Sequence, residues 1–325
     1  MKNQQRLGKG RARRVIGQVH WGLRRSVRDT YRYVLSQKLP PSIRSSLIKL
    51  REARRKARYG RYFDLYRKKG LDAVLAEIQG SVKKAQDRNK ALVAIARYTM
   101  SANVIDSERV VRALIADTDR ADLLKWSTLA VWDSGNIRLA ASLLERFQDL
   151  EHETTDTAYK VRQIRGCYRL LENPPAIPPV SSAPVCSSDS KSILYVASSS
   201  RPHHVTGYTS RTHHILRGIR ATGWNVHCVT RPGYPFDRPD ARQLTDEAAH
   251  EIDGVTYERL PGAHRREVDY DQYLWMSADV IEEVAVRLKP AVIQAASNYE
   301  AAFPALVAAK RLGIPFVYEV RGLWE

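Results

Sequence analysis

The chain has 325 residues, of which 43% are hydrophobic, so it is long enough for two domains with buried cores. Its formal net charge is +18, and residues 1–70 hold 22 Lys and Arg but only 3 Asp and Glu, which leaves a nearly neutral remainder. The three cysteines have no short spacing, which excludes a disulfide framework and a zinc motif, and the chain shows neither an apolar run of transmembrane length nor a signal peptide.

The N-terminal segment, residues 1–70, is predicted to be a basic helical arm. Apolar residues recur every three or four positions over residues 11–35, and arginines crowd the other faces. This pattern is typical of a helix that lies on anionic lipid, but an arm that packs on the following helices explains it equally well. Pro40 and Pro41 end that helix, and a second basic helix includes residues 51–58.

An excess of positive charge needs a polyanionic partner or free solvation. No nucleic-acid-binding motif accompanies the charge, so we do not expect nucleic acid to be the partner. The cysteines of the chain are expected to be reduced, which predicts a cytoplasmic protein. The basic segment predicts that this protein is peripheral on the anionic inner face of the membrane.

Residues 71–172 are predicted to form an all-α domain. Two helix pairs fit the periodicity, over 89–116 and 121–149, with an offset near that of tetratricopeptide-like hairpins. The signature positions of such repeats match poorly, so a protein-binding repeat and an ordinary helical bundle both stay open. Residues 173–190 hold five Pro and five Ser, which predicts an exposed linker and a domain boundary.

From residue 191 the pattern changes to short apolar strands that alternate with amphipathic helices. The predicted strands are 192–198, 225–230, 255–260, 291–296 and 315–320, with 255–260 placed at the sheet edge. The predicted helices are 209–222, 270–288 and 299–312, and Gly223 and Gly313 end two of them. This alternation predicts an α/β fold with a Rossmann-like, doubly wound parallel sheet.

Ligands of such sheets bind at the carboxyl ends of the strands, where the loops 198–211, 296–300 and 319–325 meet. In the first loop, Gly207 lets the backbone approach a ligand, and amides near Thr209 can hold a phosphate or a sugar hydroxyl. There is no G-x-G-x-x-G motif after the first strand, so we expect no dinucleotide cofactor.

Three segments of this region resemble the N-terminal domain of family 4 glycosyltransferases: residues 207–235, Ala295-Ala-Ser-Asn298, and residues 311–325. They occur in the family's order and spacing, and the resemblance covers roughly 193–325. It implies a GT-B architecture, in which this first domain mostly binds the acceptor. A second domain would bind the nucleotide-sugar, usually without a metal and with retention of configuration. The family's donor-side Arg/Lys pair and two glutamates belong to that second domain. We therefore expect residues 191–325 to be a truncated acceptor-side domain that is inactive alone.

The sequence departs from the family in one loop. Many members have a His-x-His in the segment that here reads Val292-Ile-Gln-Ala-Ala-Ser-Asn298. In this sequence Gln294 and Ala296 occupy the two histidine positions. Ser297 and Asn298 can still hydrogen-bond a sugar. A general base cannot be named, and the resemblance implies that the departing phosphate assists the acceptor hydroxyl.

The candidate acceptor-binding residues are Arg201, His203, His204, Gly207, Tyr208, Thr209, Arg211, Ser297, Asn298, Glu319 and Arg321. Several have a second interpretation. Arg201 and Arg211 either meet a phosphate or are solvated, and Glu319 and Arg321 either orient acceptor hydroxyls or form a structural ion pair. Trp324 either stacks on a sugar or packs between domains. Adjacent histidine pairs (203–204 and 213–214) rarely ligate one ion, so we expect no metal.

The sequence therefore predicts a glycosyltransferase of polysaccharide biosynthesis that moves a sugar from a nucleotide-sugar to a saccharide or lipid-linked acceptor, with the helical domain as a site for a protein partner. The alternative is a non-catalytic helical-repeat scaffold with a degenerate sugar-binding domain.

Overall fold

A computed structural model describes residues 41–100, 103–116, 120–147, 150, 152, 154–181, 191–238, 248–262 and 264–321. The predicted helix over 11–35, residues 182–190 of the predicted linker and Trp324 lie outside the described residues. The chain divides into two compact units, residues 1–114 and 115–325. The predicted domain boundary at 172/173 differs from this division, because the division groups the later helices with the sheet.

The described part of the first unit is helical and contains α2 (Pro41–Ser81), α3 (Ala85–Thr99) and α4 (Val104–Ile115), whose last residue falls just beyond the division. Gly70 has a φ of 78°, which interrupts α2 with a kink. Just before this kink Tyr62 and Phe63 are buried, and the Phe63 ring stacks on Tyr98 with a centroid distance of 4.5 Å. The last part of the predicted arm is thus packed core, whereas the described side chains before residue 59 are largely exposed.

The second unit begins with α5 (Ala121–Asp133), α6 (Ile137–Arg146) and α7 (Thr155–Glu172). A short turn joins α5 to α6, and the Asn136 side chain caps α6 by accepting from the Leu139 amide. Thr154 and Thr157 form a reciprocal cap at the start of α7. The predicted helix pairs are present as α3–α4 and α5–α6, and their relation to known repeats stays a prediction.

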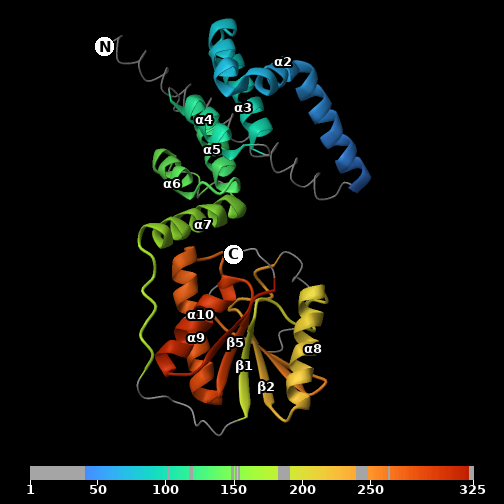
Figure 1. Ribbon diagram of the computed structural model, residues 1–325, viewed down its shortest axis with the longest axis vertical. Helices are drawn as coiled ribbons and strands as arrows, with labels where there is room; N and C mark the ends of the chain where they lie inside the picture. The colour runs from blue at the N-terminus through green and yellow to red at the C-terminus, as the bar shows by residue number, and fades with distance from the viewer. Residues whose placement is uncertain are drawn as a thin grey trace, which may run out of the picture. The chain divides into compact units, whose positions relative to one another are not determined.

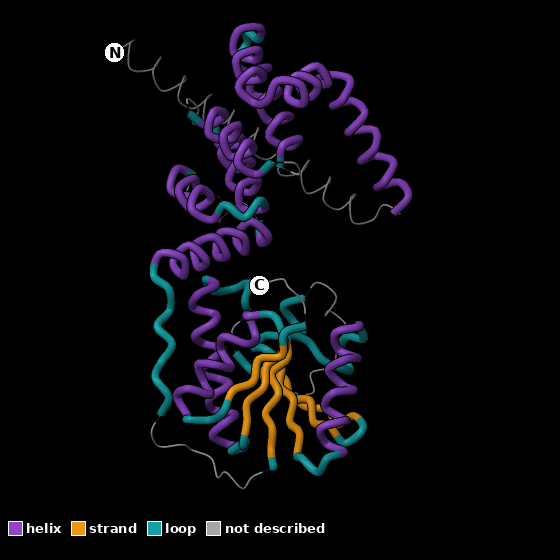
Figure 2. Tube along the Cα trace, viewed as in Figure 1, coloured by secondary structure: helices purple, strands orange, loops and turns teal. Residues whose placement is uncertain are grey.

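The rest of the second unit is an α/β domain built on one six-stranded sheet (Figures 1 and 2). Its elements are β1 (Ser192–Ala197), α8 (Gly207–Ala221), β2 (Asn225–Thr230), β3 (Ala249–Ile252), β4 (Val255–Arg259), α9 (Tyr270–Leu288), β5 (Val292–Ala296), α10 (Tyr299–Leu312) and β6 (Phe316–Glu319). The strand order is β3-β4-β2-β1-β5-β6, and all neighbours pair in parallel except β3 with β4. The predicted Rossmann-like sheet, preceded by a helical region, is confirmed.

The sheet edge was predicted wrongly. Strand β4 lies inside the sheet between β2 and β3, and the edge is the antiparallel strand β3. Its four residues, Ala-His-Glu-Ile, are partly or fully exposed and too polar for an apolar-run signal. The strand forms because the tight turn at Asp253 and Gly254 folds it back onto β4.

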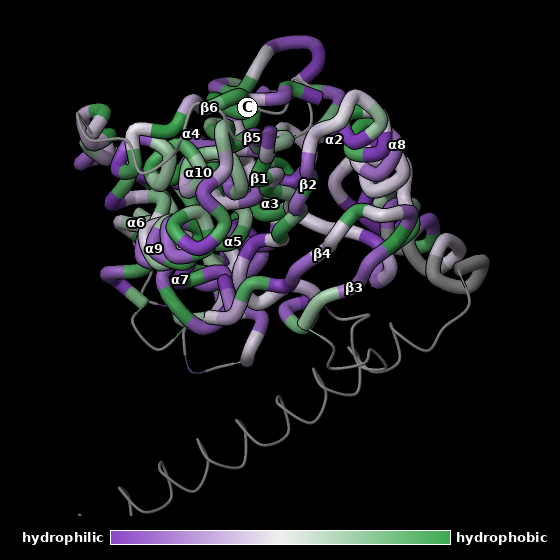
Figure 3. The backbone as a smooth tube through the Cα atoms, turned by 90° about the horizontal axis from the view of Figure 1, so that it is seen from below, coloured by the Kyte–Doolittle hydropathy of each residue, from purple (hydrophilic) through white to green (hydrophobic). Residues whose placement is uncertain are grey.

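The sheet buries both faces, with α9 and α10 on one side and α8 on the other (Figure 1). Leu194, Val196, Ile293 and Ala295 point to the α9–α10 face. The alternate residues of β1, including Tyr195, point to the α8 face. In Figure 3 the tube is coloured by residue hydropathy, and much of β1, β5 and α10 has the colour of hydrophobic residues. This alternation decides which polar side chains meet at the strand ends.

Candidate functional site

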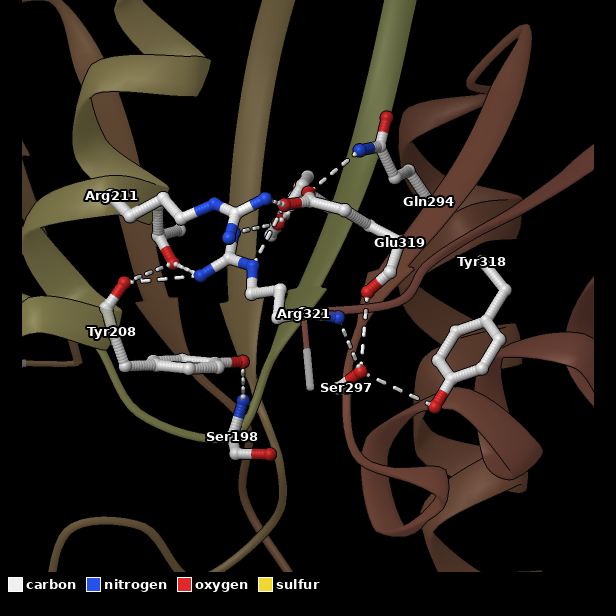
Figure 4. Close-up of polar contacts among 10 residues, drawn as sticks. Ser198, Tyr208, Arg211, Gln294, Ser297, Tyr318, Glu319 and Arg321 are labelled. Atoms are coloured by element: carbon white, nitrogen blue, oxygen red, sulfur yellow. Dashed lines mark hydrogen bonds and ion pairs between the residues drawn. The ribbon is translucent and has the colours of Figure 1, made fainter. Parts of the chain in front are cut away.

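The carboxylate of Glu319, at the end of β6, is the centre of a polar network at the carboxyl ends of the strands (Figure 4). Its Oε2 accepts from the Tyr195 hydroxyl at 2.6 Å and from Nε2 of Gln294 at 3.1 Å. Its Oε1 accepts from Nε of Arg321 at 2.8 Å. Tyr195 and Gln294 are direct neighbours in the register of β1 and β5, so the sheet itself brings these donors together.

The Arg321 guanidinium is tied to three elements. Nη1 donates to the Tyr208 carbonyl at 3.1 Å and to the Thr212 hydroxyl at 2.7 Å, both on α8, and Nη2 donates to the Tyr195 hydroxyl at 2.6 Å. The guanidinium also lies 4.7 Å from the centroid of the Tyr208 ring. With 7% of its side chain exposed, Arg321 joins α8, β1 and β6. This geometry favours the structural ion pair among the two predicted interpretations.

Hydrogen bonding controls the charge of Glu319. Burial by itself would raise the pKa of this carboxyl, but the hydrogen bonds from Arg321 and Tyr195 outweigh it, and the pKa lies below its ordinary value. Burial raises the pKa of Tyr195 well above its ordinary range, which keeps its hydroxyl a donor. Glu319 is therefore an ionised carboxylate that already accepts three hydrogen bonds, which is a poor arrangement for a general base.

The loop after β5 is held to the same network. The Ser297 amide donates to the Glu319 carbonyl at 3.0 Å, and the Ser297 hydroxyl accepts from the Arg321 amide at 2.9 Å. Asn298 is exposed and caps α10, because its Oδ1 accepts from the Glu300 amide at 3.3 Å. Of the two predicted sugar contacts on this loop, Asn298 is the one that faces solvent.

Residues 206–209 form the start of α8. The Thr206 and Thr209 side chains form a reciprocal cap, and Thr209 is 1% exposed, so its hydroxyl serves the helix. The Tyr208 hydroxyl accepts from the Ser198 amide at 3.2 Å, which ties the loop to the end of β1. Gly207 is exposed, and a Cβ there would meet no other atom of the protein, so the close approach of a ligand at this glycine stays a prediction.

The two predicted arginines of this loop have different surroundings. Arg211 has 54% of its side chain exposed, and its Nη2 lies 3.7 Å from Oε1 of Glu319 (Figure 4). Arg201 is half-buried and donates to the Ser210 hydroxyl at 3.3 Å. Arg211 is thus the cation that extends from the Glu319 network into solvent.

His203 and His204, in the loop after β1, lie beside Tyr234, which belongs to the loop after β2. The Tyr234 hydroxyl donates to the Ser200 carbonyl at 3.0 Å and accepts from the Ser200 amide at 3.2 Å, and its oxygen lies 2.5 Å from Nδ1 of His204. His203 packs edge-on against Tyr234 and His250. The structure therefore brings His203 and His204 together, in a second group next to the Glu319 network.

A buried chain of charges follows along the same edge of the sheet. Asp237 pairs with Arg231 at 2.6 Å and with Arg265 at 2.8 Å, and its carboxylate is fully buried. Arg265 continues to Glu300, in the first turn of α10, at 3.1 Å. Since buried charges need partners, these alternating signs hold the loops after β2 and β4 to the start of α10.

Sequence reasoning missed Tyr195, Gln294 and Thr212 as members of the Glu319 network, and it missed the Asp237 chain. A residue with a polar side-chain group inside an apolar strand is a usable signal for the first group. Side chains alternate along a strand, so Tyr195 and Gln294, which are register partners, lie on the same face of the sheet. Asp237 offers no such signal, since its partners come from distant loops.

Among the residues that the structure describes, no group of three or more His, Cys, Asp or Glu could hold a metal ion. Within the same residues, every helix is too short or too polar to cross a membrane.

A doubly wound, mostly parallel sheet with polar side chains gathered at the carboxyl ends of its strands is the architecture of a Rossmann-like domain. Residues 206–325 match the family model of the glycosyl transferase 4-like domain, so this part of the chain is a glycosyltransferase domain of the family 4 type. Comparisons with curated proteins and with solved structures found no match.

Proposed function

We propose that this chain provides the acceptor-side part of an enzyme that transfers a sugar from a nucleotide-sugar to a saccharide or lipid-linked acceptor in polysaccharide biosynthesis. The observation that carries the proposal is the glycosyl transferase 4-like match over residues 206–325, the region that supplies most of the ligand edge. Retention of configuration and independence of metal follow from the same resemblance.

In this proposal the exposed polar groups bind the acceptor and the buried ones hold them in place. Arg211 and Asn298 reach solvent at the ligand edge, at the starts of α8 and α10. Glu319 and Arg321 act behind them as positioning residues, because their hydrogen-bonding groups are engaged within the protein. The family resemblance implies that a second sheet domain holds the donor phosphates, so we assign only acceptor binding to residues 191–325.

Two arginines of α8 provide a matched pair of variants for the test. Arg211 and Arg217 have 54% and 52% of their side chains exposed, but Arg217 pairs with Asp253 at the β3–β4 turn. A saccharide array probed with the chain identifies the acceptor class. Arg211→Ala is then expected to weaken binding about tenfold, the loss of one charge-assisted hydrogen bond, whereas Arg217→Ala leaves it unchanged.

Each outcome of this test has a clear meaning. An array that yields no saccharide or lipid-linked saccharide ligand would contradict the proposal. Sugar transfer by the 325 residues alone would contradict the assignment to the acceptor side only. Equal binding by the two variants would move the site away from the start of α8 and favour a non-catalytic, sugar-binding scaffold.

We propose further that the basic N-terminal segment attaches the enzyme to the anionic inner face of the membrane. Lys49, Arg54, Lys56 and Arg58 are exposed on the first part of α2, before its packed residues begin. Lysine and arginine near an anionic bilayer each favour binding by about 1 kcal/mol. A peripheral location would bring a lipid-linked acceptor to the site.

A further inference from the structure

Helix α7 touches the α/β domain at a position where only glycine fits. A Cβ atom on Gly166 would lie 2.5 Å from the Tyr270 amide nitrogen and 2.6 Å from that of Asp271. Glycine inside a helix costs about 1 kcal/mol relative to alanine, so its presence here is explained by the close approach. Backbone of α7 thus lies directly against the first turn of α9.

Charge pairs hold the same contact. Arg169 on α7 donates from Nε and Nη2 to the two oxygens of Asp271, at 2.7 and 2.6 Å, and from Nη2 to Asp269 at 2.6 Å. Burial would raise the pKa of Asp271, but the bonds from Arg169 and the backbone amides lower it below its ordinary value. Tyr270, Tyr273 and Leu274 pack beside this pair against Cys167 and Leu170.

The loop between β4 and α9 is held from both sides by adjacent arginines. Arg266 points to α7, where it pairs with Asp156 at 2.6 Å and lies 4.6 Å from the centroid of the Tyr159 ring. Arg265 points to the ligand edge, where it pairs with Asp237 and Glu300. Glu300 is two residues from Asn298, so a continuous set of contacts leads from α7 to the candidate acceptor residues.

We propose that α7 is a positioning element of the glycosyltransferase domain: Gly166 and Arg169 fix it on the start of α9, and it thereby sets the 264–269 loop and, through Arg265, the start of α10 at the acceptor edge. The functional part of this inference rests on the proposed function, whereas the positioning itself does not. It assigns a role to a helix that lies before the matched family region.

Hydrogen exchange of the full chain tests the positioning without any substrate. Gly166→Ala forces the two backbones apart, and amides of 264–274 and 297–303 are expected to exchange at least about tenfold faster, while β1 and β2 keep their rates. The matched control is Gly218→Ala, because Gly218 also lies in a helix interior but has open space around it. It is expected to change none of these rates.

A second variant covers the case in which Gly166→Ala does not fold. Arg169→Ala is expected to speed exchange over the same two segments, and Arg169→Lys, which keeps the charge but loses the two-pronged bond to Asp271, is expected to restore part of the protection. Unchanged exchange in 264–274, or equal acceleration throughout the sheet, would overturn the positioning role.

The acceptor identified by the array then tests the functional part. Suppose that hydrogen exchange confirms the positioning role of α7. An acceptor affinity that Arg169→Ala leaves unchanged would then contradict the link from α7 to the acceptor edge. Weaker binding that Arg169→Lys restores would support it. Absence of any acceptor would count against the proposed function and would leave the exchange result standing.

Discussion

Arg321 donates from Nε to Oε1 of Glu319 at 2.8 Å, and only 7% and 14% of the two side chains are exposed. The residues are two apart in sequence, but the pair is completed by Tyr195, which lies on a strand more than 120 residues away and contacts both. This ion pair therefore joins the first and last described strands of the α/β domain to α8.

Removal of the Arg321 side chain is expected to destabilise the sheet by about 3 kcal/mol, because the largely buried Glu319 carboxylate loses its nearer, hydrogen-bonded cation and keeps only the exposed Arg211 at 3.7 Å. The measurement is pulse alkylation of the fully buried Cys228 across a urea series, which reports unfolding of the sheet alone. Arg138→Ala is the control, since the Arg138–Glu172 pair is exposed on both sides and worth less than about 1 kcal/mol. Equal effects of the two variants would contradict a structural role for Arg321.

Glu319 predicts a specific pH dependence. Its folded pKa lies below the ordinary value of about 4.3, so its contribution to stability is present above that pH and is lost as the pH falls through the folded pKa. Wild type is therefore expected to exceed Glu319→Gln in unfolding free energy at pH 7, and the difference is expected to shrink below about pH 4. A difference that stays constant from pH 7 to 3 would argue against this ionised carboxylate.

Thiol labelling distinguishes two described cysteines. Burial raises the pKa of Cys167 to about 11, and it raises that of the fully buried Cys228 further. At pH 8 we expect iodoacetamide to label Cys167 roughly a hundredfold more slowly than a free thiol, and Cys228 not at all before unfolding. Mass spectrometry measures each site separately. Arg169→Ala should speed labelling of Cys167, next to the α7 contact, and leave Cys228 protected.

The turn between β3 and β4 depends on backbone conformation. Asp253 and Gly254 have φ values of 51° and 73°, and a Cβ on Gly254 would lie 2.4 Å from Cζ of Arg220. Gly254→Ala is expected to cost at least about 1 kcal/mol of stability, whereas Gly218→Ala, in the open interior of α8, should gain about 0.5–1 kcal/mol. Urea unfolding measures both, and effects of equal sign would contradict this distinction.

Membrane attachment is tested with vesicles that contain anionic lipid. Replacement of Arg54, Lys56 and Arg58 by Gln is expected to weaken co-sedimentation about a hundredfold, because three favourable charges are removed. These positions avoid the packed residues Tyr62 and Phe63, which a deletion of residues 1–70 would remove. The control replaces Arg138, Arg217 and Arg287, which are exposed elsewhere. Equal losses for the two triple variants would contradict attachment through α2.

The sequence by itself determined the order and type of the elements in the α/β domain, except for strand β3. Strand β2 and helices α9 and α10 have the bounds that were predicted, because hydrophobic periodicity depends on neighbouring residues. Gly313 ends α10 in the left-handed conformation for the same local reason. The family resemblance was also readable, since its motifs are continuous segments.

The tertiary structure alone decided which of these elements meet. Strand β3 exists through its pairing with β4, and the Arg169–Asp271 contact joins residues about 100 positions apart. Likewise, Arg321 was visible as a candidate, but its partners on β1 and α8 were not. Such contacts depend on how strands and helices are placed in space, and local periodicity carries no information about that placement.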